Sequence, residues 1–292
     1  MIKRLLKRLT TSRQRVALKR FKRHAFEIFL RKNRTSLNDV KKILIDDLGI
    51  KKNDKIIVAS SFGNLNADFS PADLIHLLQS IVSKEGCIMM PYYPPINSNE
   101  WAKGNCIFDM SKTKSGMGIL TNVFARMPDV YMSVHPTKAV CVWGKDAENI
   151  VRGHSVSETP FYWDSPYGKF IKGSKSLGLG LKNIPIFHTL EDVLSVDKFY
   201  YYYKEKKKLS VIDKCGKRME VETYIHNSEL LSECVSAGDY VASLHCKTYK
   251  RLKLGYGILY IIDNNDLFQS VKYEFSIGNT RLKKHENNLL NT

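Results

Sequence analysis

One histidine and one glutamate are spaced so that together they could accept and transfer a proton. His188 opens a helical stretch and Glu191 follows three residues later, which places both side chains on one face of a helix. A carboxylate beside an imidazole holds one ring tautomer and makes the ring more basic. The pair is therefore a candidate proton acceptor. The structural alternative is a residue at a helix N-terminus with a capping-type glutamate.

Two clusters of small and hydroxyl-bearing residues could hold a phosphate or a developing oxyanion. The clusters are Ser115, Gly116, Met117 and Gly118, and, earlier in the chain, Ser60 and Ser61. The first is expected to begin a helix over residues 115–127, with its serine as the N-cap and a first turn that lets the backbone approach a ligand. The second follows a predicted strand, at the edge where open α/β sheets bind ligands. The structural alternatives are helix capping and a turn.

Other polar residues give weaker signals. His135 precedes Pro136, and this turn either aims the imidazole into a cleft or satisfies a buried backbone group. His154 and Asp164 could face a substrate. Six scattered cysteines form no C-x-x-C pair, and no histidine spacing suggests a metal. Without a signal peptide or spanning segment, the sequence predicts a cytoplasmic protein with no metal.

Hydrophobic periodicity beyond residue 35 predicts alternating strands and helices. Four short apolar runs are expected to be strands: residues 55–59, 87–90, 139–143 and 177–179. The expected helices include residues 36–47 and a helix that Ser70 caps and Pro71 begins. Gly178 and Gly180 are expected to allow close backbone packing, because a dinucleotide fingerprint needs a third glycine. The alternation predicts an α/β sheet with helices on its faces.

Several short segments, in their order along the chain, resemble the aminoglycoside 3-N-acetyltransferase family, also called the antibiotic N-acetyltransferase family. The segments are Ala59-Ser60-Ser61-Phe62-Gly63, Met90-Pro91-Tyr92-Tyr93, Phe108-Asp109, Thr113-Lys114-Ser115-Gly116-Met117-Gly118-Ile119-Leu120, Met132-Ser133-Val134-His135-Pro136, Asp164-Ser165-Pro166-Tyr167-Gly168-Lys169 and His188-Thr189-Leu190-Glu191. With a closing strand and helix, the resemblance covers about residues 37–275.

The resemblance implies a three-layer α/β/α sandwich, distinct from the small acetyltransferase fold, and an acetyl-CoA-dependent N-acetyltransferase. Such a reaction needs a neutral amine and hence a base. The family implies His188 as general base and Glu191 as the residue that orients it or binds substrate. The two clusters of small residues would contact acetyl-CoA. Tyr92, His135 and Asp164 would contact the acceptor.

Most of the net positive charge lies at the N-terminus. The net charge is +17, and residues 1–35 hold thirteen Lys or Arg residues against one acid, Glu27. Apolar residues recur there at three- and four-residue steps, which predicts a basic amphipathic leader helix. The helix could lie on an anionic membrane, pack on protein or contact nucleic acid. The expected organisation is this leader, an acetyltransferase domain over residues 36–278 and a polar tail over residues 279–292.

The charge of the body guides the choice of acceptor. Aminoglycosides are polycations that favour an acidic or neutral cleft, whereas this body is mildly basic. The favoured hypothesis is an amino sugar linked to a nucleotide and used in surface-glycan synthesis, with the leader at the inner face of the membrane. The alternative is antibiotic resistance by aminoglycoside acetylation. A non-catalytic scaffold at nucleic acid or membrane is the rival of another class. No specific nucleic acid is expected, and a homo-oligomer stays open.

Overall fold

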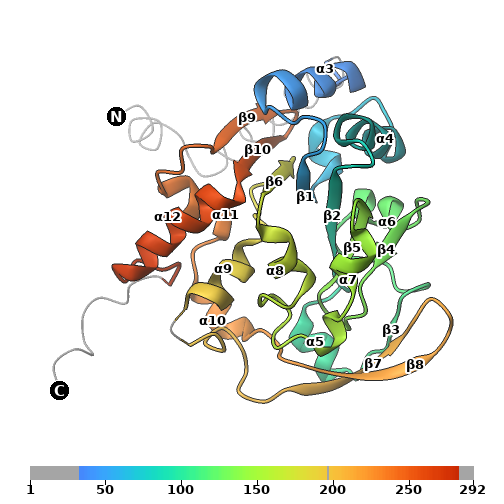
Figure 1. The fold of residues 1–292 in the computed structure, drawn as a ribbon, viewed down its shortest axis with the longest axis vertical. Helices are drawn as coiled ribbons and strands as arrows, with labels where there is room; N and C mark the ends of the chain where they lie inside the picture. Colours follow the sequence, from blue (N-terminus) through green and yellow to red (C-terminus); the bar gives the residue numbers. More distant parts are fainter. Residues whose placement is uncertain (1–32, 196, 283–292) are drawn as a thin grey trace, which may run out of the picture.

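The computed structural model describes residues 33–195 and 197–282 (Figure 1). The predicted leader helix therefore lies almost wholly outside the described residues, as does the tail beyond residue 282. Within the described ranges, no helix has the length and apolar character needed to cross a bilayer.

A mixed sheet of seven strands forms the centre of the fold, in the order β4-β5-β2-β1-β6-β10-β9. The three central strands β2, β1 and β6 are parallel, and the flanking strands β5 and β10 pair with them antiparallel. The strand bounds are β1 Lys55–Ser60, β2 Cys87–Tyr92, β4 Val130–Met132, β5 Ala139–Gly144, β6 Ser174–Leu179, β9 Lys250–Leu254 and β10 Gly257–Asp263. The parallel centre means that three strand ends meet at one edge.

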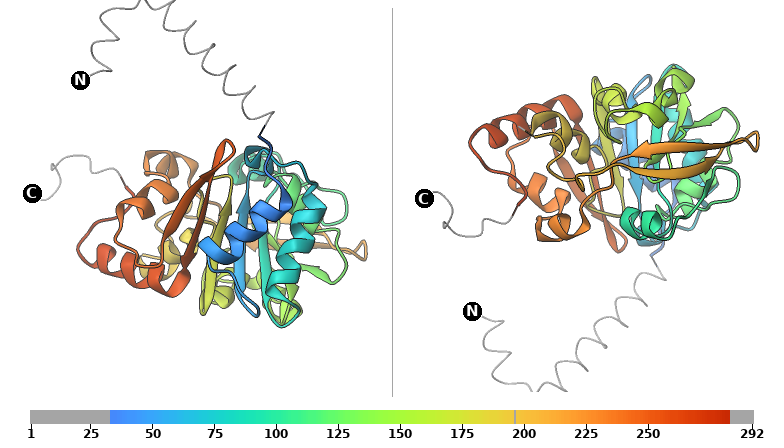
Figure 2. Two further views of the ribbon diagram at one scale, coloured as in Figure 1. Left: turned by 90° about the horizontal axis from the view of Figure 1, so that it is seen from above. Right: turned by 90° about the horizontal axis from the view of Figure 1, so that it is seen from below.

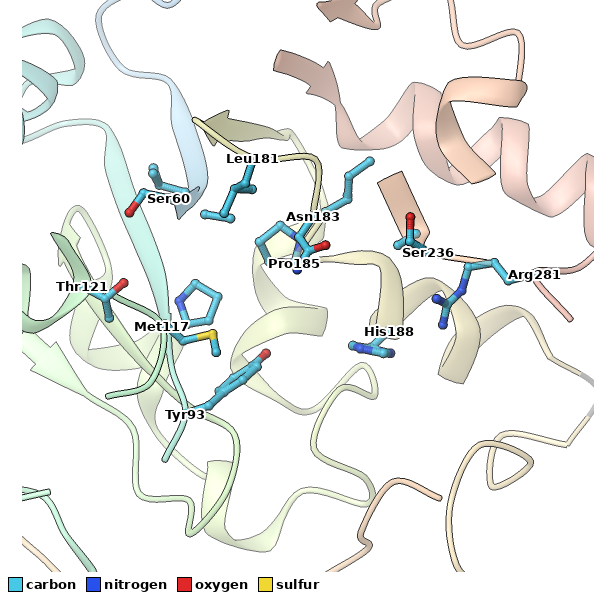
Figure 3. Close-up of a pocket in the computed structure, with 15 residues that line it drawn as sticks. Ser60, Tyr93, Met117, Thr121, Leu181, Asn183, Pro185, His188, Ser236 and Arg281 are labelled. Carbon is cyan, nitrogen blue, oxygen red and sulfur yellow. The ribbon is translucent and has the colours of Figure 1, made fainter. Parts of the chain in front are cut away.

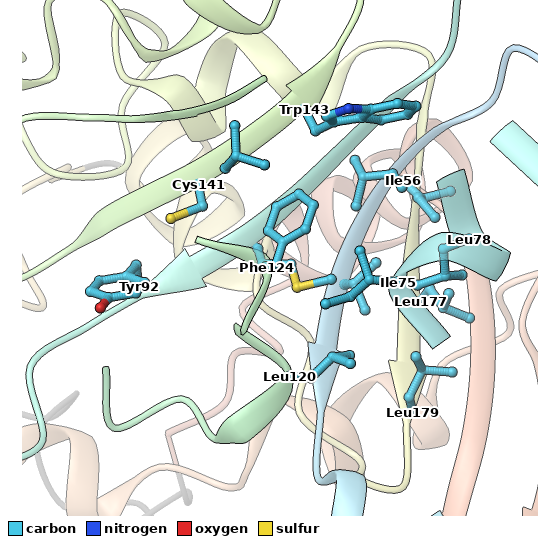
Figure 4. Close-up of a cluster of buried hydrophobic side chains, with 14 of the residues drawn as sticks. Ile56, Ile75, Leu78, Tyr92, Leu120, Phe124, Cys141, Trp143, Leu177 and Leu179 are labelled. Atoms are coloured by element: carbon cyan, nitrogen blue, oxygen red, sulfur yellow. The ribbon is translucent and has the colours of Figure 1, made fainter. Parts of the chain in front are cut away.

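Helices cover both faces of this sheet (Figure 2). One face carries α3 Leu37–Lys42, a π-helical turn Ile43–Asp47, α4 Pro71–Val82 and α6 Ile119–Phe124. The other carries α7 Ala147–Val151, α8 Pro166–Ile171, α9 Phe187–Leu194, α11 Ala237–Ser243 and α12 Asn264–Ser276. Strand side chains alternate between the two layers, so Ile56 and Val58 join one core and Ile57 the other. Figure 4 shows part of the first core, in which Ile56 of β1 lies near Ile75 and Leu78 of α4. The predicted three-layer α/β/α sandwich is confirmed.

A second, three-stranded sheet stands apart from the large one. It consists of β3 Phe108–Asp109, β7 Lys207–Ile212 and β8 Arg218–Thr223, in the order β3-β7-β8. The sequence did not predict this sheet, because β3 has only two residues and β7 begins with exposed lysines. Two short α-helices, α5 Ser98–Lys103 and α10 Ser228–Glu233, and two 3₁₀ turns, Phe62–Leu65 and His154–Val156, complete the described elements.

Local signals predicted the start of one helix correctly. Ser70 caps α4, since its side chain accepts a hydrogen bond from the backbone N–H of Asp73 and the Asp73 carboxylate bonds back to Ser70. Pro71 is the first helical residue. The predicted strands are also confirmed, although β2 passes Pro91 instead of ending there. Pro91 is tolerated because it pairs only with β5, beyond the part of β2 that pairs with β1.

The glycines at the end of β6, Gly178 in the strand and Gly180 directly after it, serve close packing, as predicted. A Cβ at Gly178 would lie 1.9 Å from the Tyr260 ring of β10. Gly180 has a φ of +83°, and a Cβ there would lie 2.5 Å from the carbonyl oxygen of Ser61. At both positions the neighbouring atoms lie so close that only a glycine, with a hydrogen atom as its side chain, fits.

We predict that Gly178→Ala lowers the free energy of unfolding by about 1–3 kcal/mol, because the added methyl group overpacks the core against Tyr260. Chemical denaturation measures the change. Gly63→Ala is the matched control, since a Cβ at Gly63 has open space around it. Equal stability of the two variants would contradict the packing argument.

Candidate active site

The carboxyl ends of the three parallel strands converge on one edge of the large sheet, where open α/β sheets bind ligands. A first cavity of about 290 Å³ lies at this edge (Figure 3). Strand ends, α6, the loop before α9 and the start of α11 contribute to its lining. The side chains that matter most here are Ser60, Tyr93, Met117, Thr121, His188 and Arg281.

A second cavity of about 320 Å³ adjoins the first. Its lining comes from residues 93–99, which lead into α5, and from the start of α10. The side chains of Lys138 and His226, from elsewhere in the chain, also line it. Tyr93, Met117 and His188 line both cavities. His188 therefore lines both adjoining spaces, as expected of a group that acts on two substrates at once.

The imidazole of His188 is oriented by a buried carboxylate. His188 is the second residue of α9, and Glu191 follows one turn later with a side chain that is 1% exposed. Nδ1 of His188 lies 2.8 Å from Oε2 of Glu191. Because an ionised carboxylate only accepts hydrogen bonds, Nδ1 carries the proton in the neutral ring. Nε2 is then the atom with a free lone pair.

Arg281 holds the other oxygen of the same carboxylate. Its guanidinium donates from Nε at 2.8 Å and from Nη2 at 2.5 Å to Oε1 of Glu191. A third hydrogen bond, from Nη1 to the Val235 carbonyl, fixes the guanidinium, and its plane lies over the ring of Phe187. Buried charges are tolerated when they are paired and hydrogen-bonded in this way.

Burial lowers the pKa of His188 below its usual value near 6.5, which outweighs the opposite effect of Glu191. The positive charges of Arg281 and Lys138 lower this pKa further. The imidazole is therefore neutral at pH 7, and its free nitrogen can accept a proton.

Of the residues predicted to hold a coenzyme, some line a cavity and others do not. Ser60 and Met117 line the first cavity, and Gly116 lines the second. Oγ of Ser60 is buried without a hydrogen-bond partner among the described residues, so a ligand could supply one. Ser61 lines neither cavity; it precedes a single 3₁₀ turn, Phe62–Leu65.

Ser115 does not cap a helix, and that prediction is wrong. The helix α6 begins at Ile119, with Gly118 as its N-cap at a φ of +101°. Ser115 lies in the preceding loop, where Oγ donates to the Tyr93 carbonyl and accepts from the Met117 N–H, both at 3.0 Å. The helix starts late because a positive φ at Gly118 cannot belong to a right-handed helix.

Three residues predicted to contact the acceptor line neither cavity. The hydroxyl of Tyr92 donates to the Thr113 carbonyl at 2.8 Å. Nδ1 of His135 accepts the backbone N–H of Lys138 at 2.9 Å, so this imidazole satisfies a buried backbone group, which was the alternative interpretation. Asp164 is exposed and accepts the Glu158 N–H at 2.9 Å. Each side chain has a structural partner instead.

Four residues of the site were not predicted from the sequence. Tyr93, Lys138 and His226 line the second cavity, and Arg281 holds Glu191. Tyr93 belongs to the segment Met90-Pro91-Tyr92-Tyr93, in which only Tyr92 was predicted to contact the acceptor. Lys138 and His226 carry no motif, and Arg281 was assigned to a polar tail. Among the described residues, no group of three His, Cys, Asp or Glu side chains could hold a metal ion.

Comparison with known proteins places this geometry in context. The family model described as aminoglycoside 3-N-acetyltransferase matches residues 57–276. The chain is also similar to the SPbeta prophage-derived aminoglycoside N(3')-acetyltransferase-like protein YokD of Bacillus subtilis, with 28% identity over 152 residues. That alignment covers 46% of this chain and 56% of the relative, so the chain spans about half the length of this curated relative.

Solved structures share the fold at lower identity. AAC-VIa bound to sisomicin superposes with a TM-score of 0.67 at 19% identity, over 84% of this chain and 98% of that one. AAC-IIIb in a binary complex with CoASH superposes with a TM-score of 0.63 at 16% identity, over 83% of this chain and 97% of that one. At these identities the likeness concerns the fold.

We predict that the fold loses stability as the pH falls below about 6.5. Burial lowers the pKa of His154 to about 3 and the pKa values of His135 and His226 well below 6.5. Below pH 6.5 the unfolded chain binds protons that the folded chain does not, and each such group weakens folding by ~1.4 kcal/mol per pH unit. Chemical denaturation at pH 7.5 and 5.5 tests this, and a flat profile would contradict it.

We also predict that Arg281→Met lowers the free energy of unfolding by about 3–5 kcal/mol, because it leaves the buried Glu191 carboxylate without its cation. The double variant Glu191→Gln with Arg281→Met should be less destabilised than Arg281→Met alone, since no buried charge remains. Denaturation curves of the native protein, the two single variants Arg281→Met and Glu191→Gln, and the double variant measure the coupling. Additive effects would show that the pair is not coupled.

Proposed function

Because the chain belongs to the aminoglycoside 3-N-acetyltransferase family, a family of acetyl-CoA-dependent N-acetyltransferases, we propose that it transfers the acetyl group of acetyl-CoA to the amine of an amino sugar. The observation that carries this proposal is the position of His188, which lines both cavities while Glu191 fixes its Nδ1 proton. A transferase of this kind must bring two substrates to one base.

The two cavities divide between the two substrates in this proposal. The first cavity, at the carboxyl edge of the sheet, receives the pantetheine arm and thioester of acetyl-CoA. Ser60, with its unpartnered Oγ, would hydrogen-bond the amide-rich arm, and Met117 would contact its apolar part. The second cavity receives the acceptor, so that the amine and the thioester meet beside His188.

The proposed reaction needs one base in its neutral form. The amine nitrogen attacks the thioester carbonyl carbon while Nε2 of His188 takes a proton from that nitrogen. The carbon–sulfur bond then breaks, the acetamide forms, and the departing thiolate takes the proton from His188. Glu191 stabilises the transient imidazolium, and Arg281 holds that carboxylate in place.

Family membership supports an aminoglycoside as acceptor over the nucleotide-linked amino sugar favoured from the sequence. None of the comparisons above names a nucleotide-linked sugar. The oriented His188 and Glu191 pair argues against the non-catalytic scaffold, because a scaffold does not need a base between two cavities. Membrane contact through residues 1–35 stays a proposal, since most of that segment lies outside the described residues.

We predict that His188→Gln lowers kcat for thiol release from acetyl-CoA by about 10²–10⁴-fold, the usual contribution of a general base. The Kd for acetyl-CoA should change little, because the coenzyme is held by other residues. His76→Gln, an exposed substitution on α4, is the control. Undiminished turnover of the His188 variant would remove the proposed mechanism.

A further inference from the structure

The second cavity carries a cation beside the proposed base. Lys138 stands directly before β5, and its backbone N–H donates to Nδ1 of His135 at 2.9 Å, which fixes the turn. Its side chain extends over Tyr93, with Nζ 4.5 Å from the ring centroid. Lys138 and Tyr93 line this cavity together with His188.

The charge of Lys138 has no anionic partner in the part of the chain that the structure describes. Burial lowers the pKa of Lys138 to about 8, so the amine is still mostly protonated at pH 7. The ring of Tyr93 offsets the charge only in part, since a cation–π contact is weaker than a buried ion pair. A desolvated ammonium without a counter-ion favours an anionic ligand.

The rest of the cavity lining offers no carboxylate. The side chains contributed by Asn97, Ser98 and Asn99 are neutral, and no aspartate or glutamate of the described residues lines this space. Burial keeps the pKa of His226 well below 6.5, so this imidazole is neutral too, and its buried Nε2 has no hydrogen-bond partner in the described chain. The potential in the cavity is therefore positive.

We propose that Lys138 is the binding residue for an anionic group of the acceptor, which is therefore an amino sugar that bears a carboxylate or phosphate near the reacting amine. This rests on the proposed N-acetyltransferase function, and it departs from the aminoglycoside acceptor that family membership supports. An acidic group would gain an ion pair with this half-buried ammonium, where charges interact more strongly than in bulk water. A polycationic aminoglycoside would bring further positive charge beside Lys138, which costs binding.

The same contact would affect the base. The positive charge of Lys138 lowers the pKa of His188. An acid bound to Lys138 offsets that charge, so the imidazole becomes more basic when the acceptor is present. Acceptor recognition and proton transfer are thus coupled through one lysine.

The test compares acceptors and variants in a thiol-release assay with the full-length protein and acetyl-CoA. The acceptors are glucosamine, glucosamine 6-phosphate, muramic acid and sisomicin, and the phosphate and carboxylate arms identify which acid is bound. We expect kcat/KM for at least one acidic sugar to exceed that for glucosamine by about tenfold or more. Lys138→Met should abolish this preference and raise the acceptor KM, with the KM for acetyl-CoA unchanged, whereas Lys138→Arg should retain most of the preference.

Lys52→Met is the matched control, because it removes one exposed positive charge before β1, at the sheet edge opposite the cavities. Thermal unfolding of each variant verifies folding. The inference is overturned if sisomicin or plain glucosamine is acetylated as efficiently as both acidic sugars, or if Lys138→Met slows all acceptors equally; the proposed function stands in either case. Absence of thiol release from every acceptor, together with absent acetyl-CoA binding, would remove the proposed function and this inference with it.

Discussion

The site depends on a single buried carboxylate held between two nitrogen donors. Glu191 accepts a hydrogen bond from the imidazole of His188 on one oxygen and from the guanidinium of Arg281 on the other. Its 1% exposure means that water supplies no alternative partner. The tautomer of His188 follows from this arrangement, because Nδ1 must carry the proton and Nε2 keeps its free lone pair. The arginine pairs with the carboxylate at a depth where an isolated charge would be costly.

The sheet provides the space in which that base can act. Parallel pairing of β2, β1 and β6 brings three strand ends to one edge, and the loop after β6 leads directly into α9. The close fit of β6 against β10, which Gly178 permits, fixes the strand from which this loop departs. Two adjoining cavities then meet at His188, one at the carboxyl ends of the strands and one against the segment that leads into α5. In the proposed reaction each cavity would hold one substrate.

The sequence predicted the features that depend only on residues close together in the chain. The capping box of Ser70, the apolar strands and the three-residue spacing of His188 and Glu191 all act within one turn or one strand, so the sequence shows them directly. Arg281 could not be recognised, because it meets Glu191 across 90 positions and stands in a polar stretch. The orientation of Lys138 depends likewise on the ring of Tyr93, 45 residues away. The late start of α6 depends on a positive φ at Gly118 that composition does not reveal.

The most direct measurement of the central claim is the protonation of each ring nitrogen of His188, by ¹⁵N NMR of histidine-labelled protein at pH 7. The signal is assigned by its loss in His188→Gln. We predict a neutral ring with the proton on Nδ1 and a bare Nε2, and a mixture of tautomers in Glu191→Gln, where the carboxylate no longer selects one. A proton on Nε2 of the native protein, or an imidazolium at this pH, would contradict the account.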